Sequence, residues 1–173
     1  YRVYNPDAFV NFNLYGSHNV TLTSFHSAGV YWDVHPVEGN DYYEPRTRGR
    51  YYRFPKNRMA GAFISSDYRR KFAIDLEMNN TWFSGNSRTT LYWLFSPRFR
   101  FNNKLSAVYR LERQFATNDV GFVDNVTDSI YFGTRDVNTI TNTLTADYIF
   151  TKTMSLKLNA RHYTQVTEHN LDK

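Results

Sequence analysis

The main group of side chains that could bind a charged ligand is a basic run, Arg46-Thr47-Arg48-Gly49-Arg50-Tyr51-Tyr52-Arg53, in which cations alternate with aromatic rings. An arginine can bind phosphate through two parallel hydrogen bonds, so the candidates for contact with lipid phosphates or another polyanion are Arg46, Arg48, Arg50 and Arg53. Aromatic rings interleaved with cations could also bind single-stranded nucleic acid, through base stacking and phosphate pairing. Because the run falls in a long polar connection, a solvated or lipid-contacting role is favoured, and no nucleic-acid partner is expected.

A second group of charged side chains alternates with apolar residues along extended segments. Side chains two positions apart share a face of a strand, so these charges are expected on one face and the apolar residues on the other. We expect the charged face to line a water-filled lumen and to set its electrostatics through Asp75, Glu77, Arg98, Arg100, Arg110, Glu112, Asp147, Lys157 and Arg161.

Side chains that could hold a hard cation occur in two connections: His35, Glu38, Asp41 and Glu44 at every third position of one, and Asp119, Asp124 and Asp128 in the other. Neither spacing matches a calcium-binding loop, so ordinary loop acidity is the favoured interpretation. No metal and no other cofactor is expected.

Catalytic pairs have no local support in the sequence. Ser17-His18 and His26-Ser27 are adjacent, and adjacent side chains of an extended chain point to opposite faces. No catalytic residue is assigned, and a non-enzymatic role is favoured over an enzymatic one.

The composition favours strands over helices. The 173 residues include 14 Tyr and 14 Phe but only 3 Met and no Cys, and the net charge is +5. Mean hydropathy is −0.62. The sequence contains no run of about 18 apolar residues, the length that a transmembrane helix needs. A transmembrane barrel remains compatible with this polarity, because half of every barrel strand faces a polar lumen.

The clearest strand–turn–strand unit lies between residues 140 and 163. Apolar residues alternate with polar ones up to Phe150, a short break follows at residues 151–153, and the alternation resumes at Met154. Each arm spans about 10 residues, which suits a strand that crosses a bilayer.

Similar alternation predicts further arms, near residues 8–15, 28–34, 59–65, 72–82, 91–101 and 105–112. Tight turns are expected at 16–19, 67–70, 102–104 and 151–153, with longer connections at 35–57 and 117–129. Pro97 should place its strand at a sheet edge or produce a bulge, since proline cannot donate to a ladder. Tight turns that alternate with longer connections are typical of outer-membrane barrels.

The predicted fold class is therefore all-β, an antiparallel up-and-down transmembrane β-barrel of which about eight strands belong to this chain. The alternative is a soluble β-sandwich or lipocalin-like barrel with the apolar face inward. Long arms, aromatic residues near arm ends and the mixed chemistry of the polar face favour the membrane barrel.

Several motifs together resemble a known family: residues 43–51 (YEPRTRGRY), 65–71 (SSDYRRK), 131–139 (YFGTRDVNT) and 161–163 (RHY). They resemble the C-terminal barrel domain of large outer-membrane proteins of the Bacteroidota type. Members of that family carry a carbohydrate-binding-like β-sandwich ahead of a transmembrane barrel of unassigned function. The resemblance implies an outer-membrane barrel, and the family offers no catalytic motif to transfer.

These observations lead to one hypothesis and two alternatives. Residues 1–173 are expected to form one segment of a larger outer-membrane β-barrel domain, with the N-terminal part of the full protein missing. Its expected location is the bacterial outer membrane, and its role structural, porin-like or transport-associated. The expected partners are outer-membrane lipid, other outer-membrane proteins and a glycan-uptake complex. The alternatives are an outer-membrane enzyme for lipids or glycans with a site at the rim, and a soluble binding module.

Overall fold

The computed structural model describes residues 2–4, 8–85, 87–127 and 129–169, and its regular elements there are all strands. The strands are β1 (Arg2–Tyr4), β2 (Ala8–Asn11), β3 (Leu14–Thr21), β4 (Ser27–His35), β5 (Gly39–Asp41), β6 (Tyr52–Phe54), β7 (Asn57–Ser65), β8 (Phe72–Phe83), β9 (Thr89–Arg100), β10 (Leu105–Val126), β11 (Ser129–Thr151) and β12 (Met154–His169). The predicted all-β class is confirmed.

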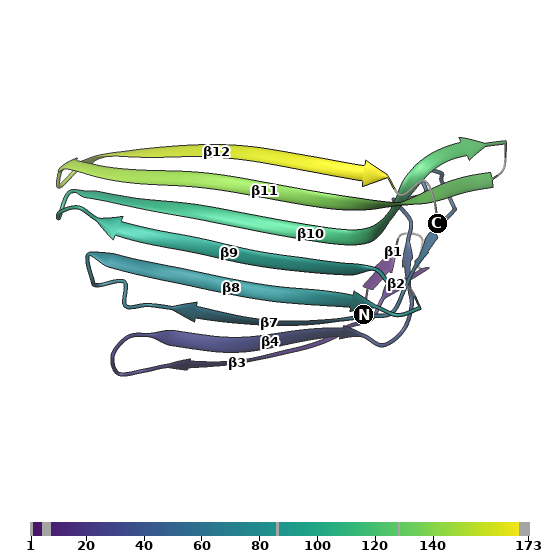
Figure 1. The fold of residues 1–173 in the computed structure, drawn as a ribbon, viewed down its shortest axis with the longest axis horizontal. Helices are drawn as coiled ribbons and strands as arrows, with labels where there is room; N and C mark the ends of the chain where they lie inside the picture. Colours follow the sequence, from purple (N-terminus) through teal and green to yellow (C-terminus); the bar gives the residue numbers. More distant parts are fainter. Residues whose placement is uncertain (1, 5–7, 86, 128, 170–173) are drawn as a thin grey trace.

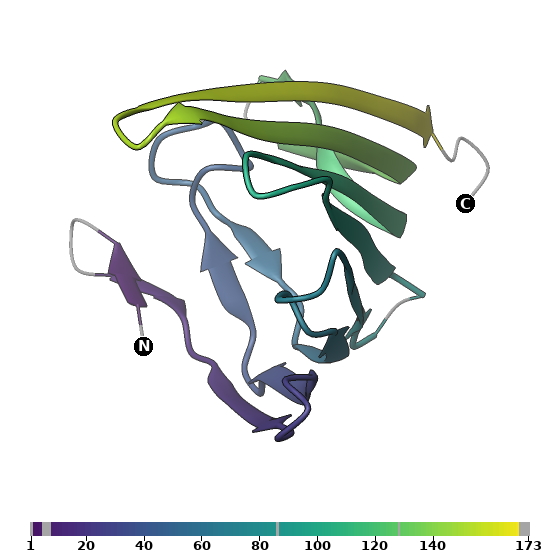
Figure 2. The same ribbon diagram turned by 90° about the vertical axis from the view of Figure 1, so that its left-hand side faces the viewer.

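Eight of these strands form one antiparallel sheet in the order β12-β11-β10-β9-β8-β7-β4-β3 (Figure 1). Sheet neighbours are also consecutive along the chain, except that β5 and β6 intervene between β4 and β7. Viewed from the end that carries the tight turns, the sheet is an open arc (Figure 2). Within the described residues β3 and β12 each pair on one side only, so the arc does not close into a barrel.

The two faces of the arc have opposite chemistry. Along β7, exposed even-numbered residues alternate with more buried odd-numbered ones. Apolar side chains dominate the exposed face, where Met78 is 59 % and Leu158 56 % exposed, whereas the other face holds the buried Ser96 and Thr141. The polar face is the inner one, because Tyr31 of β4 reaches past β7 to bond Glu77 of β8, a contact that a concave surface allows.

The predicted polar connection at residues 117–129 is wrong. β10 and β11 continue through this region for 22 and 23 residues and form a hairpin that projects beyond the sheet (Figure 1). Register shifts between Ala116 and Asp119 and between Phe122 and Asp124 mark bulges, and Asn118 has a positive φ of 52°. Bulges bend a ladder without ending it, which explains why polar residues here interrupt the alternation but not the strand.

The predicted turn at residues 16–19 is also wrong, since Gly16 to Asn19 lie inside β3. The chain turns instead after Leu22, whose N–H donates to the carbonyl of His26 at 2.8 Å while Phe25 adopts a φ of 63°. Gly16 has a packing role, because a Cβ there would meet the Trp32 ring at 2.6 Å. The turns expected near 67–70, 102–104 and 151–153 are confirmed.

Pro97 lies in β9, which pairs with both β8 and β10, so its predicted edge position is wrong. The ladder to β10 nevertheless skips this point, running from the pair Val108 and Arg98 to the pair Leu111 and Phe95. The missing N–H is therefore accommodated by a local gap in an internal ladder.

The long connection between β4 and β7 forms a separate layer at the end opposite the tight turns. We call residues 36–56 the cap; it contains the two-stranded sheet β5–β6, in which Gly39 pairs with Phe54. Figure 2 shows this layer crossing the space inside the arc. The β1–β2 hairpin lies against the cap, where the Asn40 amide donates to the carbonyl of Phe9 at 3.2 Å.

Candidate functional site

The charged residues predicted to face a lumen all lie on the inner face of the arc, hereafter the concave face. They come from five consecutive strands, β8 to β12: Asp75 and Glu77, Arg98 and Arg100, Arg110 and Glu112, Asp147, and Lys157 and Arg161. The alternation places them there because each occupies the polar position of its strand.

The centre of the concave face holds one carboxylate with several partners. Glu112 accepts hydrogen bonds from the Tyr92 hydroxyl at 2.9 Å and from Arg110 Nη2 at 3.0 Å. Glu112, Tyr92 and Arg161 also line one cavity of about 150 Å³, together with Thr141. A single carboxylate thus lies among several guanidinium groups here, so the centre of the concave face carries excess positive charge.

A second group of polar side chains joins β4 to β8 across the intervening strand β7. The Tyr31 hydroxyl donates to Glu77 Oε1 at 2.6 Å and accepts from Asn79 Nδ2 at 3.0 Å. The intervening strand β7 carries Gly61 at this point, and a Cβ there would meet the Tyr31 ring and the Asn79 side chain. The absence of a side chain at Gly61 is therefore what allows the tyrosine to lie across β7.

The remaining predicted charges gather near the tight turns. The Tyr68 hydroxyl donates to Asp75, and the guanidinium of Arg98 lies 4.7 Å from the Tyr68 ring centre. Arg100 Nη2 lies 3.4 Å from the Tyr68 carbonyl oxygen, to which it donates. On the neighbouring strands, Lys157 and Asp147 lie 3.8 Å apart.

The turn between β7 and β8 is fixed by Asp67. Its carboxylate accepts the backbone N–H of Arg69 at 3.0 Å and both side-chain nitrogens Nε and Nη2 of Arg69 at 2.9 Å. These side-chain hydrogen bonds, followed by the backbone one, lower the pKa of Asp67 to about 2. The Arg69 guanidinium in turn lies over the Phe25 ring of the β3–β4 turn, so two adjacent turns are joined.

At the opposite end the cap is attached to the projecting β10–β11 hairpin. Glu44 Oε1 accepts the backbone N–H of Phe122 at 2.8 Å, and Asn125 Nδ2 donates to Thr47 Oγ1 at 3.0 Å. The Tyr52 and Phe132 rings lie 4.9 Å apart. These contacts hold the cap across the end of the arc.

An ionic network that the sequence pattern does not indicate lies under the cap. Arg88 is 8 % exposed, and its Nη2 lies 2.6 Å from Asp119 Oδ1. Arg135 Nε lies 3.3 Å from Asp119 Oδ2, and the Arg88 guanidinium packs 4.3 Å from the Phe83 ring centre. Residues 88, 119 and 135 belong to three strands or connections, so no local sequence signal could have brought them together.

The arginines of the basic run in the cap differ in their contacts. The Arg46 guanidinium lies 4.8 Å from the Phe122 ring centre, and Arg53 Nε lies 3.5 Å from Glu38 Oε2, with both partners of that pair well exposed. Arg48 and Arg50 are exposed. Two of the four candidates, Arg46 and Arg53, therefore already have partners within the chain.

The acidic loop residues have other partners as well. Glu38 pairs with Arg53, Glu44 binds the hairpin backbone, and Asp41 Oδ1 accepts the N–H of Tyr43 at 2.8 Å. Among the residues the structure describes, no cluster of three metal-binding side chains occurs; Asp128 lies outside them.

One histidine–carboxylate pair, which the sequence did not single out, lies near the rim. His35 Nε2 is 3.1 Å from Asp33 Oδ1, and Asp33 Oδ2 accepts the Asn13 amide at 2.8 Å. Such a pair can orient a catalytic histidine, but a nucleophilic hydroxyl would also be needed. The hydrogen bonds of the described residues include none from a serine or threonine hydroxyl to His35, so the enzyme alternative gains no triad here.

The fold and this face define an antiparallel meander with a charged concave face and an apolar convex one. The described part of the chain contains no helix long and apolar enough to cross a membrane. Residues 1–172 match the model of a family described as a domain of unknown function, DUF5916, and the chain belongs to that family. No curated protein and no solved structure matches the chain significantly.

Proposed function

We propose that the chain is a section of an outer-membrane β-barrel, with lipid against its convex face and water along its concave face. The observation that carries the proposal is the inverted polarity of the sheet. Large apolar side chains are exposed on the convex face, for example Met78 at 59 % and Leu158 at 56 %. In a water-soluble β-protein the apolar face of the sheet would instead be covered by a second layer.

The size of the apolar core supports the same proposal. Among the described residues, the buried apolar side chains are only Ala73, Leu94 and Ala116 of the sheet and Pro45 of the cap. A soluble domain of about 150 residues buries roughly 70 % of its surface around a shared core. Since this sheet has almost no core of its own, a surrounding apolar medium is the simplest source of the missing burial.

Aromatic side chains mark both borders of the proposed apolar band. On β8, the exposed rings of Phe72 and Trp82 are ten positions apart, or about 33 Å along the strand at roughly 3.3 Å per residue. With a strand tilt of about 40° the vertical separation is about 25 Å, the height of the apolar band of outer-membrane barrels. Near the tight turns, the exposed rings of Phe101 and Phe150 continue the border that Phe72 marks on β8.

The open edges fit a larger barrel. β3 and β12 both leave backbone groups unpaired on their outer sides within the described residues, and in a bilayer such groups would need partners. We propose that additional strands complete the ring and enclose the concave face as a lumen. The exposed cap arginines Arg48 and Arg50 follow Thr47, which bonds Asn125 near the tip of the projecting hairpin, so they lie outside the proposed apolar band.

The proposed role is a structural or transport-associated barrel that admits small polar solutes. Reconstitution of the full-length protein into planar bilayers should give discrete conductance, and unheated protein should migrate anomalously on a denaturing gel. Glu112→Gln should shift the reversal potential in a KCl gradient in the direction of greater anion selectivity. The reason is that Arg110 and Arg161 would lose a nearby carboxylate. A protein that remains monodisperse without detergent and binds no vesicles would contradict the proposal.

A further inference from the structure

The charged side chains of the concave face are divided unevenly between its strands. On β3, β4, β7 and β8 the inward positions carry neither lysine nor arginine but three carboxylates, those of Asp33, Asp75 and Glu77. Asp33 shares its parity with Tyr31 and Asp75 with Glu77, so the hydrogen bond from Tyr31 to Glu77 places all three on the inner face. We call these four strands the acidic wall.

The strands β9 to β12 carry the opposite excess, and we call them the basic wall. Between the tight turns and the cap, their inward positions hold five cations and two carboxylates, which leaves three positive charges in excess. The cations are Arg98, Arg100, Arg110, Lys157 and Arg161, and the carboxylates are Glu112 and Asp147. Arg110 and Arg161 are exposed, so a solute inside the arc can reach them.

The two walls face each other across the inside of the arc. Viewed from the tight turns, β3 and β4 form one end of the arc and β11 and β12 form the other, with the concave space between them (Figure 2). Opposite charges also lie at similar depths. Glu77 is five positions from the start of β8, Arg110 five from the start of β10 and Arg161 seven from the start of β12, and each of these strands starts at a tight turn.

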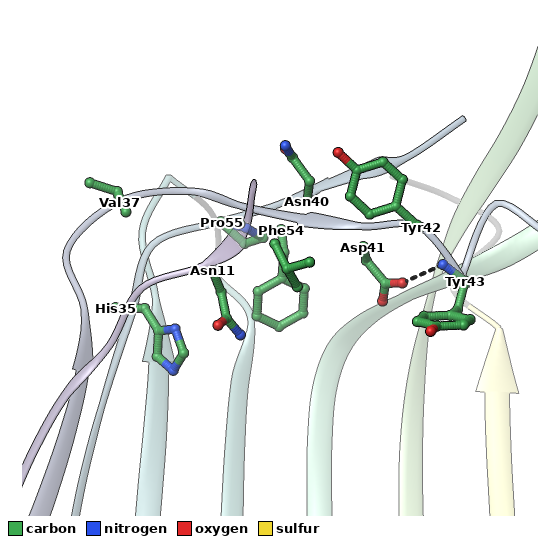
Figure 3. Close-up of a pocket in the computed structure, with 11 residues that line it drawn as sticks. Asn11, His35, Val37, Asn40, Asp41, Tyr42, Tyr43, Phe54 and Pro55 are labelled. Atoms are coloured by element: carbon green, nitrogen blue, oxygen red, sulfur yellow. Dashed lines mark hydrogen bonds between the residues drawn. The ribbon is translucent and has the colours of Figure 1, made fainter. Parts of the chain in front are cut away.

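The acidic wall keeps its negative charge. Among the described residues, none of its three carboxylates forms an ion pair with a lysine or arginine, because Glu77 and Asp75 accept tyrosine hydroxyls instead. Asp33 contacts the imidazole of His35, which Figure 3 shows pointing from the cap end toward the body of the sheet. With histidine counted as neutral, the field of these carboxylates therefore extends into the concave space.

A solute between these walls is sorted by its own charge distribution. A cation or an anion is attracted by one wall and repelled by the other, and a neutral solute gains neither attraction. A zwitterion can place each end against the wall of opposite charge. We propose that the concave face selects zwitterionic solutes, with the ammonium group toward the acidic wall and the anionic group toward the basic wall. This inference rests on the proposed barrel function and adds the class of solute.

The test is tracer influx into liposomes that contain the full-length protein, with 6-aminohexanoate as the zwitterion and arabinose as a neutral solute of similar size. At about 10 mM ionic strength, where the Debye length is about 30 Å, the zwitterion should enter faster than arabinose. In about 1 M KCl, where that length is about 3 Å, the ratio of the two influx rates should fall to the ratio of their diffusion coefficients in water.

Glu77→Gln and Arg161→Gln each remove one charge from one wall. Each should lower the influx ratio about twofold, the factor for one attraction between unit charges about 8 Å apart in water. A glutamine at position 77 keeps an oxygen that accepts the Tyr31 hydroxyl, and if one variant fails to fold the other decides. Arg58→Gln is the matched control, because it removes a charge from the convex side of β7 and should leave the ratio unchanged.

The outcomes separate this inference from the barrel function. If arabinose enters no faster than it enters protein-free liposomes, the barrel function is refuted, and this inference with it. If arabinose enters but the zwitterion is no faster, the inference alone is overturned. It is also overturned if both wall variants leave the influx ratio unchanged, or if Arg58→Gln lowers that ratio as much as they do.

Discussion

Replacing Met78 with arginine tests which medium covers the convex face. Met78 is 59 % exposed, so the substitution removes little packing. It lies six positions from Phe72 and four from Trp82 on β8, or about 20 Å and 13 Å along the strand at roughly 3.3 Å per residue. That position is close to the middle of the proposed apolar band.

If lipid covers this face, Met78→Arg should reduce the free energy of unfolding by about 2–4 kcal/mol, the cost of an arginine at the bilayer midplane. If water covers it, the change should stay within about 0.5 kcal/mol, as for other surface substitutions. The two media therefore predict results that differ by more than the error of a denaturation experiment. Leu156→Arg should be milder, about 0–1 kcal/mol, because Leu156 lies beside the β11–β12 turn, near the interface.

The assay is unfolding of the full-length protein from lipid vesicles by guanidinium chloride, followed by tryptophan fluorescence. Val126→Arg is the matched control: Val126 is 52 % exposed but lies at the tip of the projecting hairpin, outside the proposed band. Equal and small effects of Met78→Arg and Val126→Arg would refute the assignment of lipid to the convex face.

Three further perturbations test individual contacts. Asp119→Asn should destabilise the cap end by roughly 3 kcal/mol, because it removes the carboxylate that lies 2.6 Å from Nη2 of the buried Arg88, and protease sensitivity of the cap would report it. Gly61→Ala should cost roughly 1–3 kcal/mol by displacing the Tyr31 ring, measured by the unfolding midpoint. The pKa of Asp67 is lowered from 3.8 to about 2, so its stabilisation is complete above about pH 4 and is lost as the pH falls toward 2. The stability difference between wild type and Asp67→Asn should therefore shrink over that interval.

Most of the strand predictions depend on the local alternation of apolar and polar residues. β8, β11 and β12 follow segments in which apolar and polar residues alternate without long interruptions, and their tight turns lie where polar residues break the pattern. The period of two is a property of each strand alone, so the concave charges could be assigned to one face before the register was known. Which side of the sheet is enclosed, however, is a property of the whole arc.

The errors have a common cause in contacts between distant residues. Gly16 was interpreted as a turn residue, although its role is to receive the ring of Trp32 from the neighbouring strand. The 117–129 region was interpreted as a connection, although Glu44, 78 residues away, binds the backbone of Phe122 there. Neither partner can be inferred from a window of neighbouring residues, because both depend on the pairing of the complete sheet.

The enclosed side of the sheet is set by contacts between strands, and glycines alone do not reveal it. Gly29 and Gly61 lie on the same parity as Tyr31 and Phe63, and added Cβ atoms would meet those two rings. Gly16, however, receives the Trp32 ring on the convex side, and the convex positions of β7 include Ala60 and Ala62. Small residues therefore occur on both faces. The hydrogen bond that Tyr31 of β4 donates to Glu77 of β8 across β7 identifies the polar face as the inner one, and neither alternation nor glycine placement predicts it.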